Sequence, residues 1–330
     1  MSALQASDFF YTASDLMNIL GPDELIFGIT DLAAGEQFLT DYGLLPQGQG
    51  RYEALDGTAV VVKAADDPSL PTKTLDTANM LRKTVYGVTD AETLRAIADE
   101  LGRDREVKHL PDGSLECVDD VGFVLGFKVS RRRPVNLQAE RVNAPGDLNR
   151  PVNTPVAPAS GPGEPPRPRT LSHVVYFVPD VARAEAFYTQ RLGFRVSDRF
   201  IGMGPFLRPA GTIDHHTLFF IETPPHMQGC EHFTFHMGGP GEVMAAGWAF
   251  ANKGYQSYWG PGRHRFGSNW FWYFNTPFGC HIEYDADMDL HDDNWVPRET
   301  MAETDKSQIF LFDWREKWAP GGPPAKADAV

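Results

Sequence analysis

Six side chains in the second half of the chain are of the types that metal and proton chemistry uses: His173, His216, His232, His264, Tyr273 and Glu283. Nine of the ten histidines fall between positions 173 and 291, where an even scatter would place about a third of them. Histidine is the commonest neutral metal ligand and moves protons near pH 7. Two histidines and one carboxylate can occupy one face of an octahedral ion and leave the other positions open, which is typical of non-haem Fe(II) oxygenases.

The elements that must position these residues can be read from the local patterns. LSHVVYFVPD (171–180) predicts a strand, and Asp180 is a plausible N-cap for a helix over VARAEAFYTQRLGF, with Gly193 at its end. FRVSDRF, HTLFFIE and HFTFHM read as strands, PGEVMAAGWAFANKG as a second helix, and YQSYWG, NWFWYF and CHIEYD as further strands. We therefore expect the order strand, helix, strand, strand, strand to occur twice.

The first half of the chain repeats this pattern. ELIFGITDLAAGEQFLTDYGLLP aligns with HVVYFVPDVARAEAFYTQRLGFRV, which pairs Asp31 with Asp180, and DDVGFVLGF (119–127) aligns with TPFGCHIEY (276–284). The economical prediction is an α+β protein of four βαβββ modules, paired into two open-barrel domains. Glu24 stands where the second half has His173, and Gly126 where it has Glu283. We therefore expect a metal site in the C-terminal half only.

The domain boundaries follow from composition. Residues 134–170 hold nine of the 26 prolines, a composition that favours extended, solvated backbone. We predict a metal-free N-terminal domain at 1–133, a Pro-rich linker at 134–170, a catalytic domain at 171–290 and a tail at 291–330. The tail carries Trp295 and Arg298 and is expected either to cover the site or to make an oligomer contact.

At this level of detail, residues 171–285 resemble the catalytic domain of type I extradiol ring-cleavage dioxygenases, of the vicinal oxygen chelate superfamily. The matching segments are LSHVVYFVPD, DHHTLFF (214–220), EHFTF, GRH (262–264) and YFNTPFGCHIEY (273–284). The resemblance implies that His173, His232 and Glu283 bind Fe(II), with Mn(II) as the lesser choice, and that O₂ is a co-substrate. It also implies acid–base work by His216 and hydrogen bonds to the substrate from His264 and Tyr273.

The other candidates have simpler interpretations. His215 is expected to point to the opposite sheet face from His216 and to be structural. His236 and His281 share strand faces with His232 and Glu283 and are the alternatives in the ligand assignment. Glu222 and Asp285 read as exposed charges at strand ends, and Cys230 and Cys280 as buried strand residues.

The expected substrate is a small aromatic diol. Met203, Phe206 and Leu207, within 199–211, together with Phe271, are predicted to give the pocket apolar walls, which favours a bicyclic or alkyl-substituted catechol over catechol itself. Two alternatives stay open: a glyoxalase-like isomerase of the same superfamily, and a protein that sequesters small molecules on the same scaffold.

Composition excludes several classes of protein. The net charge of −14 argues against nucleic-acid binding, and the first 50 residues contain seven acids and no Lys or Arg, unlike a targeting sequence. No apolar run approaches the roughly 18 residues that span a bilayer. Three cysteines without a CxxC pair are ordinary in a reduced compartment. We expect a cytoplasmic protein with no membrane partner, assembled as a homo-oligomer.

Overall fold

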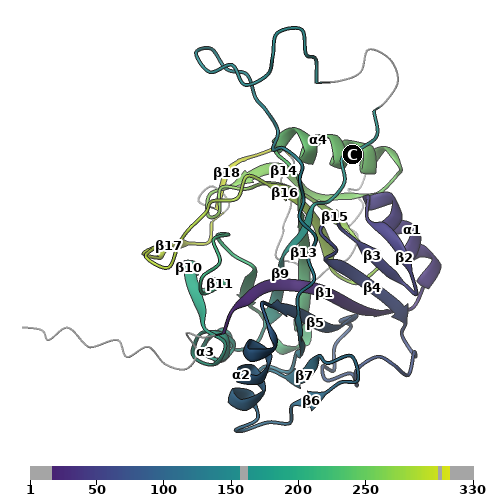
Figure 1. Ribbon diagram of the computed structural model, residues 1–330, viewed down its shortest axis with the longest axis vertical. Helices are drawn as coiled ribbons and strands as arrows, with labels where there is room; N and C mark the ends of the chain where they lie inside the picture. Colours follow the sequence, from purple (N-terminus) through teal and green to yellow (C-terminus); the bar gives the residue numbers. More distant parts are fainter. Residues whose placement is uncertain (1–16, 157–162, 304–306, 313–330) are drawn as a thin grey trace, which may run out of the picture.

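The described part of the chain forms two large β-sheets with two α-helices each (Figure 1). The computed structural model describes residues 17–156, 163–303 and 307–312. The α+β fold class and the four βαβββ modules predicted from the sequence are confirmed. None of the helices in the described residues is long and apolar enough to cross a membrane.

The N-terminal sheet has eight strands in the order β2-β3-β4-β1-β5-β8-β7-β6. The two modules meet where β1 pairs antiparallel with β5. The first module consists of β1 (Ile19–Ile29), α1 (Leu32–Tyr42), β2 (Leu45–Gly48), β3 (Arg51–Glu53) and β4 (Ala59–Ala64). The second consists of β5 (Leu81–Val88), α2 (Ala91–Leu101), β6 (Lys108–His109), β7 (Leu115–Val118) and β8 (Val124–Val129).

The C-terminal sheet has ten strands in the order β17-β10-β11-β12-β9-β13-β16-β15-β14-β18. Its first module consists of β9 (Thr170–Val178), α3 (Val181–Arg191), β10 (Phe194–Ile201), β11 (Gly204–Pro209) and β12 (Leu218–Glu222). A 3₁₀ turn, η2 (Pro225–Met227), leads to the second, with β13 (Gly229–His236), α4 (Pro240–Asn252), β14 (Ser257–His264), β15 (Trp270–Asn275) and β16 (His281–Ala286). The tail adds β17 (Arg298–Met301) and β18 (Gln308–Leu311) at the two edges.

One strand departs from the prediction. Between the predicted strands FRVSDRF and HTLFFIE no further strand was expected, but residues Gly204–Pro209 form β11, which makes a hairpin with β10. The segment GPFLRP has glycine and two prolines, which lower strand propensity, so the local pattern does not show it. Its pairing with β10 and β12 supplies the stability that the local sequence lacks.

The helices begin where the aspartates predict. The Asp31, Asp90 and Asp180 side chains accept hydrogen bonds from main-chain N–H groups in the first turns of α1, α2 and α3. Helix α1 ends at Gly43, whose φ of 107° lies in the left-handed region that glycine adopts without strain. These caps fix where each helix begins to cross its sheet.

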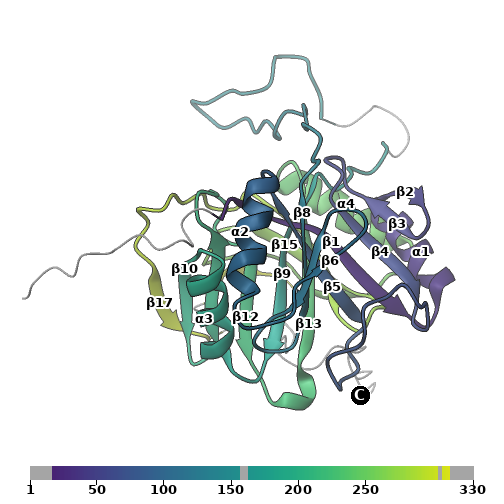
Figure 2. The ribbon, with the colours of Figure 1, turned by 60° about the horizontal axis from the view of Figure 1, so that its bottom comes forward.

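The two halves share one hydrophobic core. Its buried side chains come from both sheets and from all four helices. The Phe27 and Phe233 rings lie 5.4 Å apart across the two halves, and the Tyr42 ring stacks on Tyr284 at 4.0 Å. Figure 2 shows the blue α2 of the first half beside the teal α3 of the second. Each half therefore relies on the other to cover its apolar surface.

The segment between the halves is extended, as its prolines predict. Residues 134–156 and 163–169 contain no helix or strand apart from an isolated bridge between Ala144 and Asp147. Part of the segment loops away from the body of the molecule (Figures 1 and 2). Glu140 fixes its first part, because its carboxylate accepts a hydrogen bond from the Gly241 N–H at the start of α4.

Candidate metal centre

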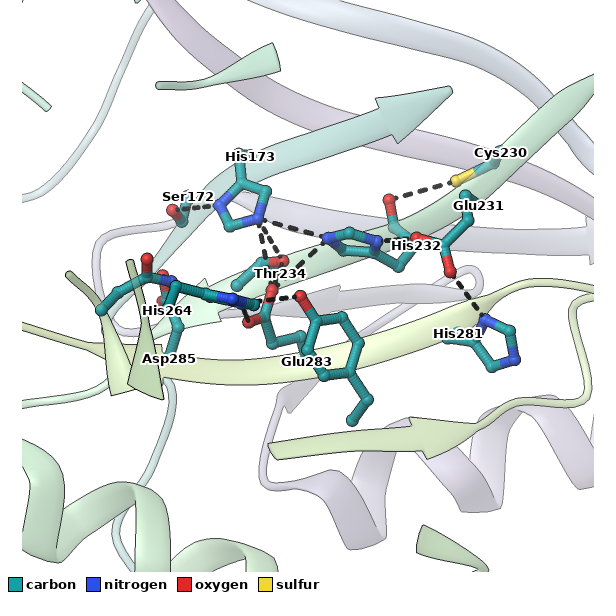
Figure 3. Close-up of polar contacts among 12 residues, drawn as sticks. Ser172, His173, Cys230, Glu231, His232, Thr234, His264, His281, Glu283 and Asp285 are labelled. Atoms are coloured by element: carbon teal, nitrogen blue, oxygen red, sulfur yellow. Dashed lines mark hydrogen bonds and ion pairs between the residues drawn. The ribbon is translucent and has the colours of Figure 1, made fainter. Parts of the chain in front are cut away.

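Three buried side chains converge on one point of the C-terminal sheet (Figure 3). The Nε2 atom of His173 lies 3.3 Å from Oε2 of Glu283 and 3.4 Å from Nε2 of His232, and the third separation, from His232 Nε2 to Glu283 Oε2, is 3.5 Å. Among the described residues this is the only such group of metal-ligating side chains.

The register of three neighbouring strands explains why these side chains lie together. β13 lies between β9 and β16, and Thr234 is the register partner of His173 on one side and of Glu283 on the other. The three residues therefore form a row across three strands. His232 precedes Thr234 by two residues and faces the same side of the sheet, because side chains alternate along a strand. The Thr234 hydroxyl donates to Glu283 Oε2 at 2.6 Å and so holds the carboxylate in place.

The groups behind the two histidines determine which nitrogen faces the centre. His232 Nδ1 is hydrogen bonded to the Glu231 carboxylate, so it carries the proton and leaves a lone pair on Nε2. His173 Nδ1 lies 2.9 Å from the Ser172 hydroxyl, so its Nε2 is likewise the atom that faces the centre.

The charge state of the carboxylate also suits a cation. Burial alone would raise the pKa of Glu283, but its contacts with His173, His232 and His264 outweigh burial and hold that pKa well below its usual value. Glu283 is fully buried. A buried anion beside two imidazole lone pairs attracts a positive ion.

The donor triangle has the dimensions of one coordination face. Two donors bound to a single ion at about 2.1 Å lie roughly 3.0 Å apart at right angles and roughly 3.4 Å apart at the tetrahedral angle. The observed separations of 3.3–3.5 Å are close to this range. The residues present therefore fit a divalent transition-metal ion.

His216, His264 and Tyr273, the predicted acid–base and hydrogen-bonding residues, surround this centre. The His216 ring lies 4.3 Å from the His173 ring, and His264 Nε2 lies 3.5 Å from Glu283 Oε1. The Tyr273 hydroxyl and His264 Nε2 are 3.2 Å apart. Burial raises the pKa of Tyr273 well above its usual value, so its phenol keeps the proton it needs to donate. Burial lowers the pKa of His216 well below its usual value, so the imidazole stays neutral.

These residues line a narrow pocket with aromatic walls. The space in it that is wide enough for water-sized molecules is only about 40 Å³. Phe206 and Phe219 stack with their ring centres 4.0 Å apart. The lining residues are His173, Val175, Phe200, Phe206, His216, Phe219, His232, Trp259, His264, Phe266, Asn269, Tyr273, Ser307 and Gln308. A slot of this form suits a planar ring.

The predicted pocket walls need correction. Phe206 lines the pocket, but Met203 packs beside the phenylalanine cluster and does not line it. Phe271 stacks on the His264 ring at 4.0 Å and supports it from behind. Leu207 alternates to the other face of β11 and lies in the main core.

Two further expectations are wrong. His215 does not point away from His216: the two Nδ1 atoms are 3.0 Å apart, because both residues precede β12 and strand alternation does not apply to them. Asp285 is fully buried, and its carboxylate contacts His236 Nδ1 at 2.6 Å.

His281 lies behind the centre. Its Nδ1 contacts Glu231 Oε1 at 3.2 Å, and its ring stacks on Tyr258 at 3.6 Å. Neither His236 nor His281 belongs to the donor triangle.

Two contributors were not foreseen. Glu231 was read only as part of the strand EHFTF, and Gln308 as part of the tail. The Gln308 Oε1 atom contacts His264 Nδ1 at 2.9 Å. A buried acid next to a candidate ligand was a signal for Glu231, whereas nothing local marks Gln308.

The N-terminal sheet has no such donor group among the described residues. Glu24, the counterpart of His173, forms ion pairs with Arg51 and Lys128. Gly126, the counterpart of Glu283, has no side chain, and a Cβ there would lie 3.1 Å from Val85. The corresponding position is thus occupied by ion pairs.

Comparison with known proteins shows which families this chain resembles. Residues 170–284 match the model of the Glyoxalase/Bleomycin resistance protein/Dioxygenase superfamily. Metapyrocatechase 2 from Cupriavidus necator is 39% identical over 37% of this chain and 38% of its own length. Biphenyl-2,3-diol 1,2-dioxygenase from Paraburkholderia xenovorans (strain LB400) is 29% identical over 82% of this chain and 88% of its own length.

Solved structures share the fold. A Mn(II)-bound glyoxalase from Novosphingobium aromaticivorans superposes with a TM-score of 0.67 at 21% identity, over 89% of this chain and 91% of its own. The 2,3-dioxygenase LapB from Pseudomonas sp. KL28 gives 0.66 at 20% identity, over 87% and 98%. The structural likeness covers both halves of the chain. The superfamily model matches residues 170–284, the half that carries the donor triangle.

Proposed function

We propose that this protein is an extradiol dioxygenase, which inserts both atoms of O₂ into a catecholic ring and cleaves the ring beside the diol. The observation that carries the proposal is the buried triangle of His173, His232 and Glu283, with three proton-handling side chains around the same pocket. The names of the two sequence relatives support the reaction class.

The ion we propose is Fe(II), held by His173, His232 and Glu283. Mn(II) would fit the same neutral nitrogen and carboxylate donors. Held there, the ion would supply one binding point for both the diol and O₂ and so bring the two reactants together. A histidine that binds a metal ion is neutral, so the donor triangle carries one negative charge, that of Glu283. This charge favours a divalent cation.

The remaining steps fall to this chain's own residues. His216 would take a proton from a substrate hydroxyl and return it later, because a neutral buried imidazole can do both. Tyr273 would donate its phenolic hydrogen bond to a substrate oxygen, and His264, oriented by Gln308, would bind beside it. The Phe206 and Phe219 rings would hold the ring plane and exclude water.

The substrate we propose is a small aromatic diol with an apolar substituent or second ring. The wall opposite the polar residues is built from Phe200, Phe206, Phe219 and Phe266, which offer apolar contacts to such a group. Catechol alone would leave these contacts unused. We further propose a cytoplasmic protein that assembles as a homo-oligomer.

A combined activity and metal assay tests the function. Protein purified anaerobically and loaded with ferrous salt should consume O₂ with 2,3-dihydroxybiphenyl, 3-methylcatechol and catechol, and give yellow, ring-opened products. A colourless dicarboxylic product would refute cleavage beside the diol. Inertness toward all three diols, with iron bound, would favour a glyoxalase-like isomerase.

The ligand assignment has its own test. His173→Ala should lose the bound iron and the activity together, because two donors remain where three are needed. His226→Ala is the matched control, since His226 is exposed and lies outside the pocket. Roughly one iron per chain is expected in wild type and in this control. An active, iron-replete His173→Ala protein would overturn the assignment.

A further inference from the structure

A chain of buried polar groups continues behind His216, away from the pocket. His216 Nδ1 lies 3.0 Å from Nδ1 of His215, and His215 Nε2 lies 2.8 Å from Oδ2 of Asp198. His215 and Asp198 are fully buried, and neither lines the pocket. His215 and Asp198 belong neither to the donor triangle nor to the pocket lining, so their contact with His216 has to be explained by another role.

Asp198 is held in the ionised form. Its Oδ1 accepts a hydrogen bond from the main-chain N–H of Arg298 at 2.7 Å, and its Oδ2 contacts the Arg298 guanidinium at 2.6 Å. Burial would raise the pKa of Asp198, but the hydrogen bonds from His215 and Arg298 outweigh it, so the pKa is lowered. A carboxylate only accepts hydrogen bonds. The Nε2 atom of His215 must therefore carry a proton.

That constraint passes along the chain to His216. When His215 is neutral with its proton on Nε2, its Nδ1 has a lone pair and can only accept a hydrogen bond. His216 Nδ1 must then be the donor across the 3.0 Å contact. The proton of a neutral His216 is thus on Nδ1, and its Nε2 has the lone pair.

We propose that His215 and Asp198 are positioning residues that fix the tautomer of His216 and leave its Nε2 as the base that faces the substrate. This inference deepens the proposed function and rests on it for its catalytic consequence. A substrate O–H bond would break as the N–H bond forms at Nε2, while Nδ1–H stays hydrogen bonded to His215. The negative charge of Asp198 would offset the positive charge that His216 gains.

The tail takes part in this arrangement. β17 pairs with β10 next to Asp198, which places the main-chain N–H of Arg298 against the carboxylate. The Arg298 guanidinium also lies over the Phe266 ring, 5.0 Å from its centre. The tail, expected from the sequence to cover the site or to contact a partner, thus helps to orient a residue of the pocket from behind.

Asp198→Asn should reverse the tautomer. The amide oxygen would turn to the Arg298 main-chain N–H, which cannot move, and the amide NH₂ would then face His215. His215 Nε2 would have to accept, its proton would move to Nδ1, and His216 Nδ1 would become the acceptor. His216 would hold its proton on Nε2, as in other sites where a carboxamide replaces the orienting carboxylate.

The experiment is a ¹H–¹⁵N correlation spectrum of full-length, histidine-labelled protein loaded with Zn(II), a diamagnetic ion that accepts the same donors. The His216 signals are assigned by their loss in His216→Phe. In wild type we expect protonated Nδ1 and bare Nε2, and in Asp198→Asn the reverse. His215→Phe, which keeps a ring but no nitrogen, should give a mixture of tautomers.

Kinetics with iron-loaded protein supply the second measurement. Asp198→Asn should lower kcat by about 10²-fold or more, the scale of general acid–base catalysis, with KM and iron content within about two-fold of wild type. Asp41→Asn is the control: it removes a carboxylate that binds Lys253, neither residue lines the pocket, and the variant should change neither tautomer nor kcat.

The outcomes separate this inference from the proposed function. The spectra need no turnover, so a wild-type protein inert toward every diol would refute the function and still test the tautomer. Bare Nδ1 in wild type, or the same tautomer in Asp198→Asn, would overturn the inference even in an active enzyme. A reversed tautomer with unchanged kcat would overturn its catalytic part.

Discussion

His232 and His216 are both imidazoles at the same pocket, yet different groups lie behind them. The Glu231 carboxylate contacts His232 Nδ1, and this leaves Nε2 of His232 for an ion. The His215 ring contacts His216 Nδ1, and His216 is not part of the donor triangle. At the residue scale, both imidazoles keep a lone pair on Nε2, and it is their position relative to the donor triangle that separates a metal ligand from a proton acceptor.

His216→Phe tests the proton role. We expect iron and substrate binding to be retained, because the donor triangle is intact, and turnover to fall by about 10²–10⁴-fold. Iron content and steady-state kinetics measure the two effects separately. Loss of iron from this variant would make His216 a ligand, and turnover within a few-fold of wild type would leave it without a catalytic role.

Glu231→Gln tests the group behind a ligand. The amide would hold His232 less well than the carboxylate, so affinity for the metal should fall by about 10–100-fold, while the fold is kept. Competition with a chromophoric chelator measures this. Glu222→Gln is the matched control, because Glu222 is an exposed acid at the end of β12. Equal affinity in both variants would contradict the role of Glu231.

Much of the candidate site could be predicted from the residues themselves. The residue types and their spacing indicated a metal site, and the resemblance to the dioxygenases singled out His173, His232 and Glu283. Glu231 escaped because alternation would turn it away from His232. The register shift in the pairing of β13 with β9, between Cys230 and His232, is a long-range feature that local sequence does not encode.

At the scale of elements, the strand that carries Glu283 is tied to a helix of the other half. The Tyr42 hydroxyl, at the end of α1, donates to the main-chain oxygen of Glu283 at 2.7 Å, and the Tyr284 hydroxyl donates back to the Tyr42 carbonyl at 2.6 Å. The two rings stack at 4.0 Å. Helix α1 thus helps to fix the position of β16.

Tyr42→Phe should weaken this connection. The ring stack survives, but the Glu283 carbonyl loses a buried hydrogen-bond donor, so the free energy of unfolding should fall by about 1–2 kcal/mol. Denaturant unfolding measures the loss. The side-chain donors of the triangle are untouched, so iron content should remain near wild type. Unchanged stability would mean that the hydroxyl contributes nothing to holding the strand.

The modules were predictable, whereas their edges were not. An aspartate N-cap and apolar periodicity, both local signals, marked α3, and the internal repeat extended the same pattern to α1. β11 and β17 are stabilised by pairing with β10, and β18 by pairing with β14. The sequences of these three strands have no local pattern that predicts a strand.

For the whole molecule, the contact between the halves contains a buried acid. Asp119 accepts main-chain hydrogen bonds from Val121 and Phe123, and the Tyr188 hydroxyl of the other half lies 3.4 Å away. Burial raises the pKa of Asp119 to about 7, even though the main-chain N–H groups of Phe123 and Val121 oppose the shift. An unfolded aspartate releases its proton near pH 4.

Stability should therefore fall as pH rises from about 4 to about 7, because the unfolded chain binds fewer protons than the folded one in this range. Asp119→Asn removes the effect. The variant should gain roughly 2–3 kcal/mol relative to wild type between pH 5 and pH 8, as measured by denaturant unfolding at both values. A pH-independent difference between the two proteins would contradict a raised pKa.

The core that joins the two sheets makes the protein a single cooperative unit. Amide hydrogens at the centres of β1 and β9 should exchange with solvent at a common, slow rate, because neither strand can open without exposing the other half. A cavity made at Phe27, in the half without metal ligands, would raise the fraction of molecules in which the ligand strands are apart. A cell would then clear those molecules through its proteases. Substitutions that lower the amount of this protein in cells should therefore occur as often at core positions outside the pocket as at positions in the pocket.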